Sequence, residues 1–222
     1  MNKTRLRDPA PALILASQSK GRAALLRSAG YAFHQIPAPI DEPAPPAGGH
    51  LDRYVLKLAC LKAEAVAEAF PRAIVIGADT ALIIGKTIIG KPGTLKEARR
   101  MLALLGGRKH RISSAACILF PAATPKGRRR TVRVVDTAHV VLRKWSPARI
   151  RAHVALTQPL SWAGAYAVQD SYSAAIVERI EGDLATVIGL PMRMVDRMLV
   201  TRLDLGLIQR SWRCGHRLSP VS

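Results

Sequence analysis

Carboxylates and cations lie at the junctions between the predicted strands, helices and loops of this 222-residue chain. Asp41 and Glu42 are neighbours in a Pro-rich loop, and Asp79 stands where the apolar strand of "IGADT" is expected to end. Strand ends and the loops beyond them are where α/β proteins usually build their sites. Lys62 in "LKAEA" and Lys91 in "IGKPG" add two cations to the set. Carboxylates combined with lysines favour metal-assisted phosphoryl transfer over acyl chemistry.

Each of these residues also has an ordinary structural interpretation. The loop acids can be solvated charges, and Asp79 can be a turn former. Lys62 can lie on an exposed helix face, and Lys91 can be a turn residue beside Pro92. Motifs for other kinds of site are absent. The sequence contains neither the phosphate-binding loop G-x-x-x-x-G-K-[ST] nor the nucleophile elbow G-x-S-x-G, and its histidines lack the zinc-binding spacing H-E-x-x-H. The combination of residue types therefore carries the hypothesis.

The stretch "LILASQSKGRAALL" joins a predicted buried strand to a predicted helix. Ser17 and Ser19 are good N-cap residues, but Lys20 and Arg22 occupy the first turn, where the helix dipole favours acids by about 0.3 to 1 kcal/mol. On the dipole alone, Arg22→Glu should preserve or raise the melting temperature of the ligand-free protein. Cations at this position therefore need an explanation outside the helix itself.

The chain has a large excess of basic residues, with 34 Lys and Arg against 15 Asp and Glu and a formal charge of +19. A polyanionic partner, either nucleic acid or a nucleotide, fits this charge. Part of the excess lies in one loop and in the C-terminal tail, where we expect solvated charges: Lys126, Arg128, Arg129, Arg130, Arg133, Arg210, Arg213 and Arg217. Aromatic residues are not interleaved with them, which disfavours binding of single-stranded nucleic acid.

Cysteine usage and hydropathy indicate the compartment. The three scattered cysteines have no C-x-x-C spacing, so they predict neither a disulfide framework nor a thiolate metal site, and they fit a reducing compartment. The apolar stretch near the start is too short for a signal peptide, and no other segment reaches the length of a membrane span. We expect a soluble cytoplasmic protein.

Strands and helices alternate along the sequence, which predicts an α/β or α+β fold with a mixed sheet. Apolar runs predict strands at residues 13–17, 33–37, 73–79, 110–120, 130–143 and 171–180, with a further β-rich stretch broken by Gly85 and Gly90. The segments 110–120 and 130–143 are expected to pair as a long hairpin. Helical spacing and caps, including the Thr94 and Glu97 capping box, predict helices at residues 20–29, 51–69, 95–105, 147–156 and 189–205.

Seven motifs follow one another in the order and at the spacing of the Maf family: "LILASQSKGRAALL", "IDE", "LACLKAEAVA", "VIGADTALIIGKTIIGKP", "EARRMLALLGGRKH", "WAGAYAVQD" and "IEGDLATVIGLP". The sequence thus resembles a family of nucleoside triphosphate pyrophosphatases that is historically linked to septum formation. We therefore expect an N-terminal extension at residues 1–12, a Maf-like domain at 13–205 and a basic tail at 206–222.

The resemblance implies a strongly twisted mixed α/β fold similar to the inosine triphosphate pyrophosphatases, with two lobes around a cleft, and a homodimer. It implies hydrolysis of a nucleoside triphosphate to the monophosphate and pyrophosphate, with magnesium or manganese as the cofactor. By the same motifs, the residues that contact the substrate would be Ser17, Ser19, Arg22 and Thr80.

The catalytic residues implied by the resemblance are Asp79, Glu42, Lys62, Lys91 and Gln169. Glu42 and Asp79 would bind the metal or activate water, with Asp79 orienting the attacking water. Lys62 and Lys91 would neutralise charge on the phosphates, and Gln169 would complete the polar lining. A triphosphate at the helix start would explain the cations there, because the anion meets the helix amides, the dipole and the side-chain charges together.

The sequence departs from the family pattern where the substrate is concerned. "SKGR" at residues 19–22 stands where the family commonly has Ser-Pro-Arg-Arg, so one arginine is lost. "GADT" and "AGAYAVQ" resemble the branch that acts on dTTP and UTP, but Trp162 and Gln158 replace a lysine and a glutamate of that branch. Trp162 is either a core aromatic or a base-stacking residue. We expect dTTP, UTP or a modified nucleotide as the substrate.

A second hypothesis comes from a different class. It is a catalytically weakened Maf-like protein that binds nucleic acid or a protein partner through its basic surface. The joint presence of Glu42, Asp79, Lys62, Lys91 and Gln169 favours retained catalysis.

Overall fold

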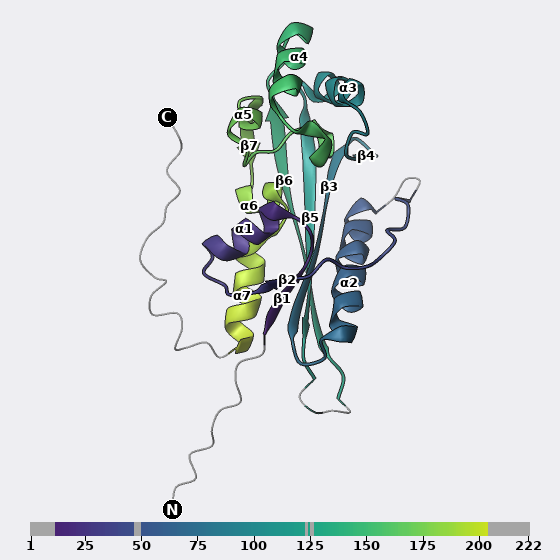
Figure 1. Ribbon diagram of the computed structural model, residues 1–222, viewed down its shortest axis with the longest axis vertical. Helices are drawn as coiled ribbons and strands as arrows, with labels where there is room; N and C mark the ends of the chain where they lie inside the picture. The colour runs from purple at the N-terminus through teal and green to yellow at the C-terminus, as the bar shows by residue number, and fades with distance from the viewer. Residues whose placement is uncertain (1–11, 47–49, 123, 125–126, 204–222) are drawn as a thin grey trace, which may run out of the picture.

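The computed structural model describes residues 12–46, 50–122, 124 and 127–203, which form one twisted sheet with helices on both faces (Figure 1). The strands are β1 (Leu13–Ala16), β2 (His34–Gln35), β3 (Ile74–Ile84), β4 (Thr87–Ile89), β5 (Lys109–Phe120), β6 (Arg130–Leu142) and β7 (Val177–Glu181). The α-helices are α1 (Lys20–Ser28), α2 (Leu51–Ala69), α3 (Leu95–Leu105), α4 (Pro147–Leu156), α5 (Ser171–Ala174), α6 (Leu184–Ile188) and α7 (Met192–Leu203). Two short 3₁₀ helices are η1 (Pro159–Ser161) and η2 (Ala163–Ala165).

The sheet has seven strands in the order β2-β1-β3-β5-β6-β7, and β4 pairs with β3. β1 runs parallel to both β2 and β3, whereas the other pairs are antiparallel. The mixture of parallel and antiparallel pairs confirms the predicted fold class. The predicted long hairpin is also confirmed, since β5 pairs with β6 along its whole length.

The alternation of side chains along β3 divides the core between two faces of the sheet. Val75 and Ile83 pack in the cluster under α2, whereas Ile74 and Ile76 pack in the cluster under α1 and α7. Figure 1 shows α2 on one side of the sheet and α1 and α7 on the other. Residues of β3 with odd numbers therefore face the side of the sheet that carries α2, and residues with even numbers face the side that carries α1.

A third apolar cluster makes a second lobe at the other end of the long hairpin. It joins α3, α4 and β6 through Leu102, Ile150 and Val140, and all of these side chains are buried. Figure 1 shows α3, α4 and α5 at one end of β5 and β6, and α1, α2 and α7 towards the other. The sheet thus carries two lobes along one pair of long strands.

The edge of β3 is uncovered between these lobes. β1 ends at Ala16, opposite Gly77, and β4 first pairs with β3 at Leu82. Among the described residues, no strand pairs with residues 78–81 on this side of β3. We call this stretch the edge gap.

The prediction that a strand ends at Asp79 is wrong, because β3 continues to Ile84. Asp is depleted in strands, so the polar pair Asp79-Thr80 resembles a strand end. Pairing with β5 overrides that local signal, since Asp79 lies opposite Ala115 and Thr80 lies opposite Ser114.

Two other expected elements differ because aspartate caps begin short helices. The predicted strand at 171–180 starts as α5, where Asp170 accepts a hydrogen bond from the N–H of Ser173, and only β7 is extended. The predicted helix at 189–205 corresponds to α7, and a separate helix, α6, precedes it with Asp183 as its N-cap. Both caps satisfy N–H groups at a helix start.

The other helix predictions are confirmed, with α2 and α3 at their expected bounds and α1 one residue shorter than expected. Thr94 accepts from the N–H of Glu97 as a capping box requires, but the Glu97 carboxylate accepts from Gly93 instead of Thr94. Ser146 caps α4 with Pro147 in its first turn. Within the described part of the chain, none of the helices is both long and apolar enough to traverse a bilayer.

The basic loop contains one arginine with a structural role. Nη2 of Arg129 donates hydrogen bonds to the carbonyl oxygens of Ala67 and Phe70, each at 2.9 Å, at the C-terminal end of α2. The expectation of a solvated charge is therefore wrong for Arg129, whose cation satisfies carbonyls that the helix end leaves free. Arg128 and Arg130 are exposed, as expected. Lys126, Arg210, Arg213 and Arg217 lie outside the described residues.

Gly77 allows α2 to lie directly on β3. A Cβ atom at this position would lie 2.1 Å from the carbonyl oxygen of Ala59 and 2.5 Å from the nitrogen of Ala63. We expect Gly77→Ala to lower the free energy of unfolding by about 3 kcal/mol, because the backbone of α2 must move away from the sheet. Urea denaturation measures this loss.

Gly90→Ala is the matched control, because a Cβ atom at Gly90 would meet nothing within 4 Å. We expect its unfolding midpoint to stay close to that of the native protein. Equal midpoints for Gly77→Ala and Gly90→Ala would contradict the close packing of α2.

Candidate functional site

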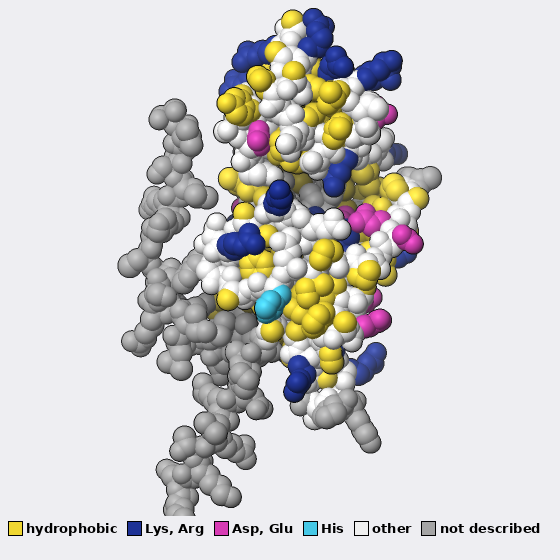
Figure 2. Space-filling model, viewed as in Figure 1, with side chains coloured by type: hydrophobic (Ala, Val, Ile, Leu, Met, Phe, Trp, Pro, Cys, Tyr) yellow, Lys and Arg dark blue, Asp and Glu magenta, His cyan; other side chains and the backbone are white. Residues whose placement is uncertain are grey.

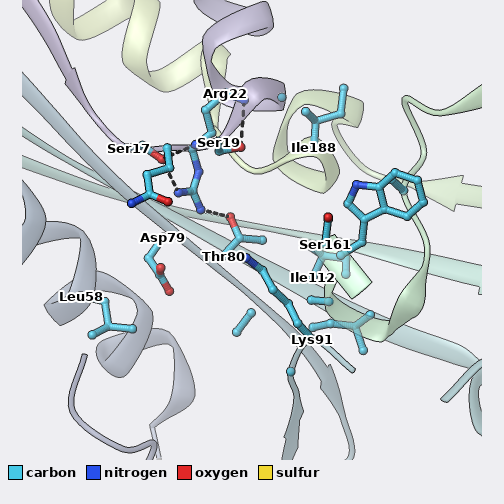
Figure 3. A pocket seen from close by; sticks show the side chains of 18 of the residues that line it. Ser17, Ser19, Arg22, Leu58, Asp79, Thr80, Lys91, Ile112, Ser161 and Ile188 are labelled. Carbon is cyan, nitrogen blue, oxygen red and sulfur yellow. Dashed lines mark hydrogen bonds between the residues drawn. The ribbon is translucent and has the colours of Figure 1, made fainter. Parts of the chain in front are cut away.

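A cavity of about 970 Å³ opens at the edge gap, between the two lobes. Every residue that the sequence predicts for the site lines it: Ser17, Ser19, Arg22, Glu42, Lys62, Asp79, Thr80, Lys91 and Gln169. Figure 3 shows several of these side chains converging from α1, β3 and the segment after β4. The structure thus brings together residues from motifs that are far apart in the sequence.

The turn between β1 and α1 forms one wall of the cavity. The Ser19 hydroxyl caps α1 by accepting from the N–H of Arg22 at 3.3 Å, and the Ser17 hydroxyl accepts from the N–H of Ser19 at 3.2 Å. Nε2 of Gln35 in β2 donates to the carbonyl oxygen of Ser17 at 2.8 Å. These bonds hold the turn with the start of α1 at the cavity, where unpaired N–H groups attract anions.

The guanidinium of Arg22 is held by acceptors from three parts of the chain. Its Nε donates to the carbonyl oxygen of Gly189 at 2.8 Å, Nη1 to the Ser17 hydroxyl at 3.0 Å, and Nη2 to the Thr80 hydroxyl at 3.0 Å. An arginine has five N–H groups, so one on each terminal nitrogen remains for a ligand. Burial lowers the pKa of Arg22, and the charges of Asp79 and Glu42 act in the opposite direction.

Lys62 of α2 joins the two candidate carboxylates. Its Nζ lies 2.6 Å from Oδ1 of Asp79 and 2.7 Å from Oε1 of Glu42. The side chains of Lys62 and Asp79 are only 13% and 12% exposed, whereas that of Glu42 is 50% exposed. Burial raises the pKa of Asp79, although the charges of Lys62 and Arg22 work against this shift.

Asp79 and Thr80 are adjacent in β3 and therefore point to opposite faces of the sheet. Asp79 faces α2 and meets Lys62, whereas Thr80 faces α1 and meets Arg22. The edge gap lets both side chains reach one cavity. One face of the sheet thus brings Asp79 and Lys62 to the site, and the other face brings Thr80 and Arg22 to it.

The Pro-rich loop separates its two acids. Glu42 lines the cavity, whereas Asp41 is exposed and is not part of the lining. The Tyr54 hydroxyl of α2 donates to the carbonyl oxygen of Pro43 at 2.8 Å and so fixes the loop beside Lys62. Asp41 is therefore a solvated loop charge, whereas Glu42 forms an ion pair with Lys62.

Lys91 and Gln169 complete the polar lining from the second lobe. Lys91 follows β4 and extends into the cavity (Figure 3). Gln169 approaches the start of α1, since a Cβ atom on Gly21 would lie 3.5 Å from its Nε2. Trp162 and Gln158 line the same side of the cavity.

The family model for Maf, described as Maf-like protein, matches residues 12–202. The chain belongs to the Maf-like family. The dTTP/UTP pyrophosphatase of Anaeromyxobacter dehalogenans strain 2CP-1 is 39% identical over 183 residues, or 82% of this chain and 90% of the relative. The 7-methyl-GTP pyrophosphatase of Alkalilimnicola ehrlichii is 39% identical over 191 residues, or 85% of this chain and 92% of the relative.

A solved nucleoside-triphosphatase, a dITP/XTP pyrophosphatase from Mycobacterium abscessus, aligns with 92% of this Maf-like chain and 100% of its own. The TM-score is 0.40 and the identity 16%, a likeness too low to support a conclusion.

The carboxylates of this Maf-like protein fit a magnesium or manganese ion. Lys62 engages Oδ1 of Asp79 and Oε1 of Glu42, so that each carboxyl group keeps a second oxygen for a ligand. Magnesium is usually held by one or two carboxylates together with substrate phosphates and water. In the described residues, no group of three or more His, Cys, Asp or Glu side chains is placed so that it could hold a metal ion, so phosphate oxygens and water would complete the coordination.

Several residues that hold the site together were not predicted from the sequence, among them Gly189 and Ser114. Gly189 accepts from both Arg22 and Thr80 through its carbonyl oxygen, at 2.8 and 3.1 Å. Its φ of +125° favours glycine, and the "IGLP" motif signals only a helix end. The hydroxyl oxygen of Ser114 lies 2.9 Å from that of Thr80, and the only sequence signal for Ser114 is a serine within the largely apolar run "ISSAACILF".

Proposed function

We propose that this Maf-like protein hydrolyses a nucleoside triphosphate to the monophosphate and pyrophosphate. The observation that carries the proposal is the convergence of Arg22, Lys62 and Lys91 with two carboxylates at one helix start. The names of the relatives support the same reaction class. In this proposal the phosphates lie against the start of α1, where the free N–H groups of the Arg22 guanidinium bind them.

The carboxylates and lysines supply the chemistry in this proposal. Asp79 orients the attacking water, because it is a buried carboxylate that Lys62 holds in place. Glu42 and Asp79 would hold a divalent cation, which would offset charge on the phosphoryl oxygens. Lys91 neutralises charge that develops on the leaving pyrophosphate.

The base would lie towards the second lobe, away from Arg22. Trp162 and Gln158 line the cavity there. We propose dTTP or UTP as the first candidate substrates, with a modified nucleotide such as 7-methyl-GTP next. The name of the Anaeromyxobacter relative supports dTTP or UTP, and the name of the Alkalilimnicola relative supports 7-methyl-GTP.

We also propose that the protein acts as a homodimer, as the resemblance implies, and that it acts in the cytoplasm, as its cysteine usage indicates. Sedimentation equilibrium of the full chain tests the dimer, and a single species at the monomer mass would contradict it.

The alternative, a weakened relative that binds polyanions, draws on the basic surface. Figure 2 shows Lys and Arg side chains over the lobe that contains α3 and α4. The paired state of Lys62, Asp79 and Glu42 argues against it, because an abandoned site has no need to keep a buried ion pair.

A nucleotide panel tests the proposed reaction. UTP, dTTP, 7-methyl-GTP and the common nucleoside triphosphates are assayed for pyrophosphate release with magnesium or manganese, and with a chelator as control. We expect metal-dependent release of pyrophosphate and monophosphate from at least one pyrimidine triphosphate or from 7-methyl-GTP. Release of orthophosphate alone, or no turnover of any triphosphate, would contradict the proposal.

A further inference from the structure

Three polar side chains form a row across neighbouring strands next to the cavity. Thr80 of β3 lies opposite Ser114 of β5, and Ser114 lies opposite Asp136 of β6. The hydroxyl oxygens of Thr80 and Ser114 are 2.9 Å apart. Cross-strand partners share one face of a sheet, so the three side chains all face the side that carries α1 and α6. We call Thr80, Ser114 and Asp136 the polar row.

Helix α6 is bonded to the polar row through Thr186, in the middle of the helix. The Thr186 hydroxyl donates to Oδ2 of Asp136 at 2.6 Å, and the Ser114 hydroxyl donates to the carbonyl oxygen of Thr186 at 2.7 Å. Beyond the end of α6, the carbonyl oxygen of Gly189 accepts from the Thr80 hydroxyl at 3.1 Å. The row thus determines where the segment from Thr186 to Gly189 lies.

The hydrogens of the row can be assigned. Ser114 gives its only hydroxyl hydrogen to the carbonyl oxygen of Thr186. The hydrogen between the two hydroxyls therefore comes from Thr80, which shares it between Ser114 and the carbonyl oxygen of Gly189. The Thr80 oxygen is then free to accept from Nη2 of Arg22.

Burial makes this arrangement costly unless every polar group is paired. Ser114 and Thr186 are fully buried. The neighbours of Ser114 on the same face of β5, Ile112 and Ala116, are apolar. An apolar row would fill the same space without a desolvation cost, but it would not hold the Gly189 carbonyl against Nε of Arg22.

We propose that Ser114, Asp136 and Thr186 are positioning residues for Arg22. They hold α6 so that the Gly189 carbonyl and the Thr80 hydroxyl orient the guanidinium towards the phosphates. None of the three lines the cavity, so they act through Arg22 and not on the substrate. This inference rests on the proposed function, in which Arg22 binds the phosphates.

Thr186→Val tests the inference, because it keeps the shape of the side chain and removes the bond to Asp136. We expect the affinity for the α,β-methylene analogues of UTP and 7-methyl-GTP, measured by calorimetry with magnesium, to fall about tenfold. KM should rise by a similar factor while kcat changes less, and Thr186→Ser should restore both. Thr137→Val, at the exposed neighbour of Asp136 in β6, is the matched control and should behave as the native protein.

A double-mutant cycle separates positioning from general stability. In an Arg22→Lys background, Thr186→Val should have little further effect on affinity, since the guanidinium that it orients is gone. If Thr186→Val does not fold, Asp136→Ala replaces it, with Asp136→Asn as the conservative variant that keeps an acceptor for Thr186.

The outcomes distinguish this proposal from the function on which it rests. If the native protein binds neither analogue and hydrolyses no triphosphate, the proposed function fails, and the role of the row fails with it. If the native protein binds but folded Thr186→Val or Asp136→Ala binds equally well, only the positioning role is overturned. An equal loss in the native and Arg22→Lys backgrounds would also overturn it.

Discussion

Asp79→Asn is expected to lower the turnover of nucleoside triphosphate by about a hundredfold or more while the protein stays folded. The change is nearly isosteric, and it removes the charge that would orient water and hold a metal. The fold should survive because Lys62 keeps Glu42 as an ionic partner at 2.7 Å. Pyrophosphate release at saturating substrate measures turnover, and thermal unfolding checks the fold.

Asp41→Asn is the matched control for this experiment. Asp41 precedes Glu42 in the loop but is exposed and lies outside the cavity lining. We expect its turnover to equal that of the native protein. Near-native turnover of folded Asp79→Asn would remove Asp79 from the catalytic role.

Arg22→Lys is expected to lower kcat/KM by about a hundredfold although the positive charge is kept. A lysine cannot reproduce the fork that joins the Gly189 carbonyl, Ser17 and Thr80 while leaving N–H groups for a phosphate. Steady-state kinetics and calorimetry with a non-hydrolysable triphosphate measure the loss.

Arg27→Lys serves as the control for Arg22→Lys, because Arg27 lies in the last turn of the same helix and contacts the ring of Phe33 outside the cavity. We expect its affinity and kcat/KM to be unchanged. Unchanged affinity in folded Arg22→Lys would show that the phosphates lie elsewhere.

The structure also reverses the expectation for Arg22→Glu in the absence of ligand. The helix dipole alone predicts an equal or higher melting temperature. A carboxylate at this position would instead face the Gly189 carbonyl, which now accepts from Nε of Arg22 at 2.8 Å. The melting temperature of the ligand-free variant should therefore fall, because the carbonyl loses its donor and gains a like partial charge.

The sequence by itself determined the elements whose signals are local. Apolar spacing was sufficient to place α2 at its observed bounds, and the Thr94 cap together with apolar spacing placed α3, because these signals act within a few turns of one helix. The alternation of strands and helices predicted the mixed sheet. The family motifs also identified nine of the side chains that line the cavity.

Only the tertiary structure decided how these side chains combine. Pairing with β5 carries β3 past Asp79, and the early end of β1 leaves the edge gap through which Asp79 and Thr80 reach one cavity from opposite faces. Arg22 meets Gly189 across 167 positions of the sequence. Such contacts depend on strand register and on the docking of α2 and α6, which long-range packing sets and no local pattern of residues records.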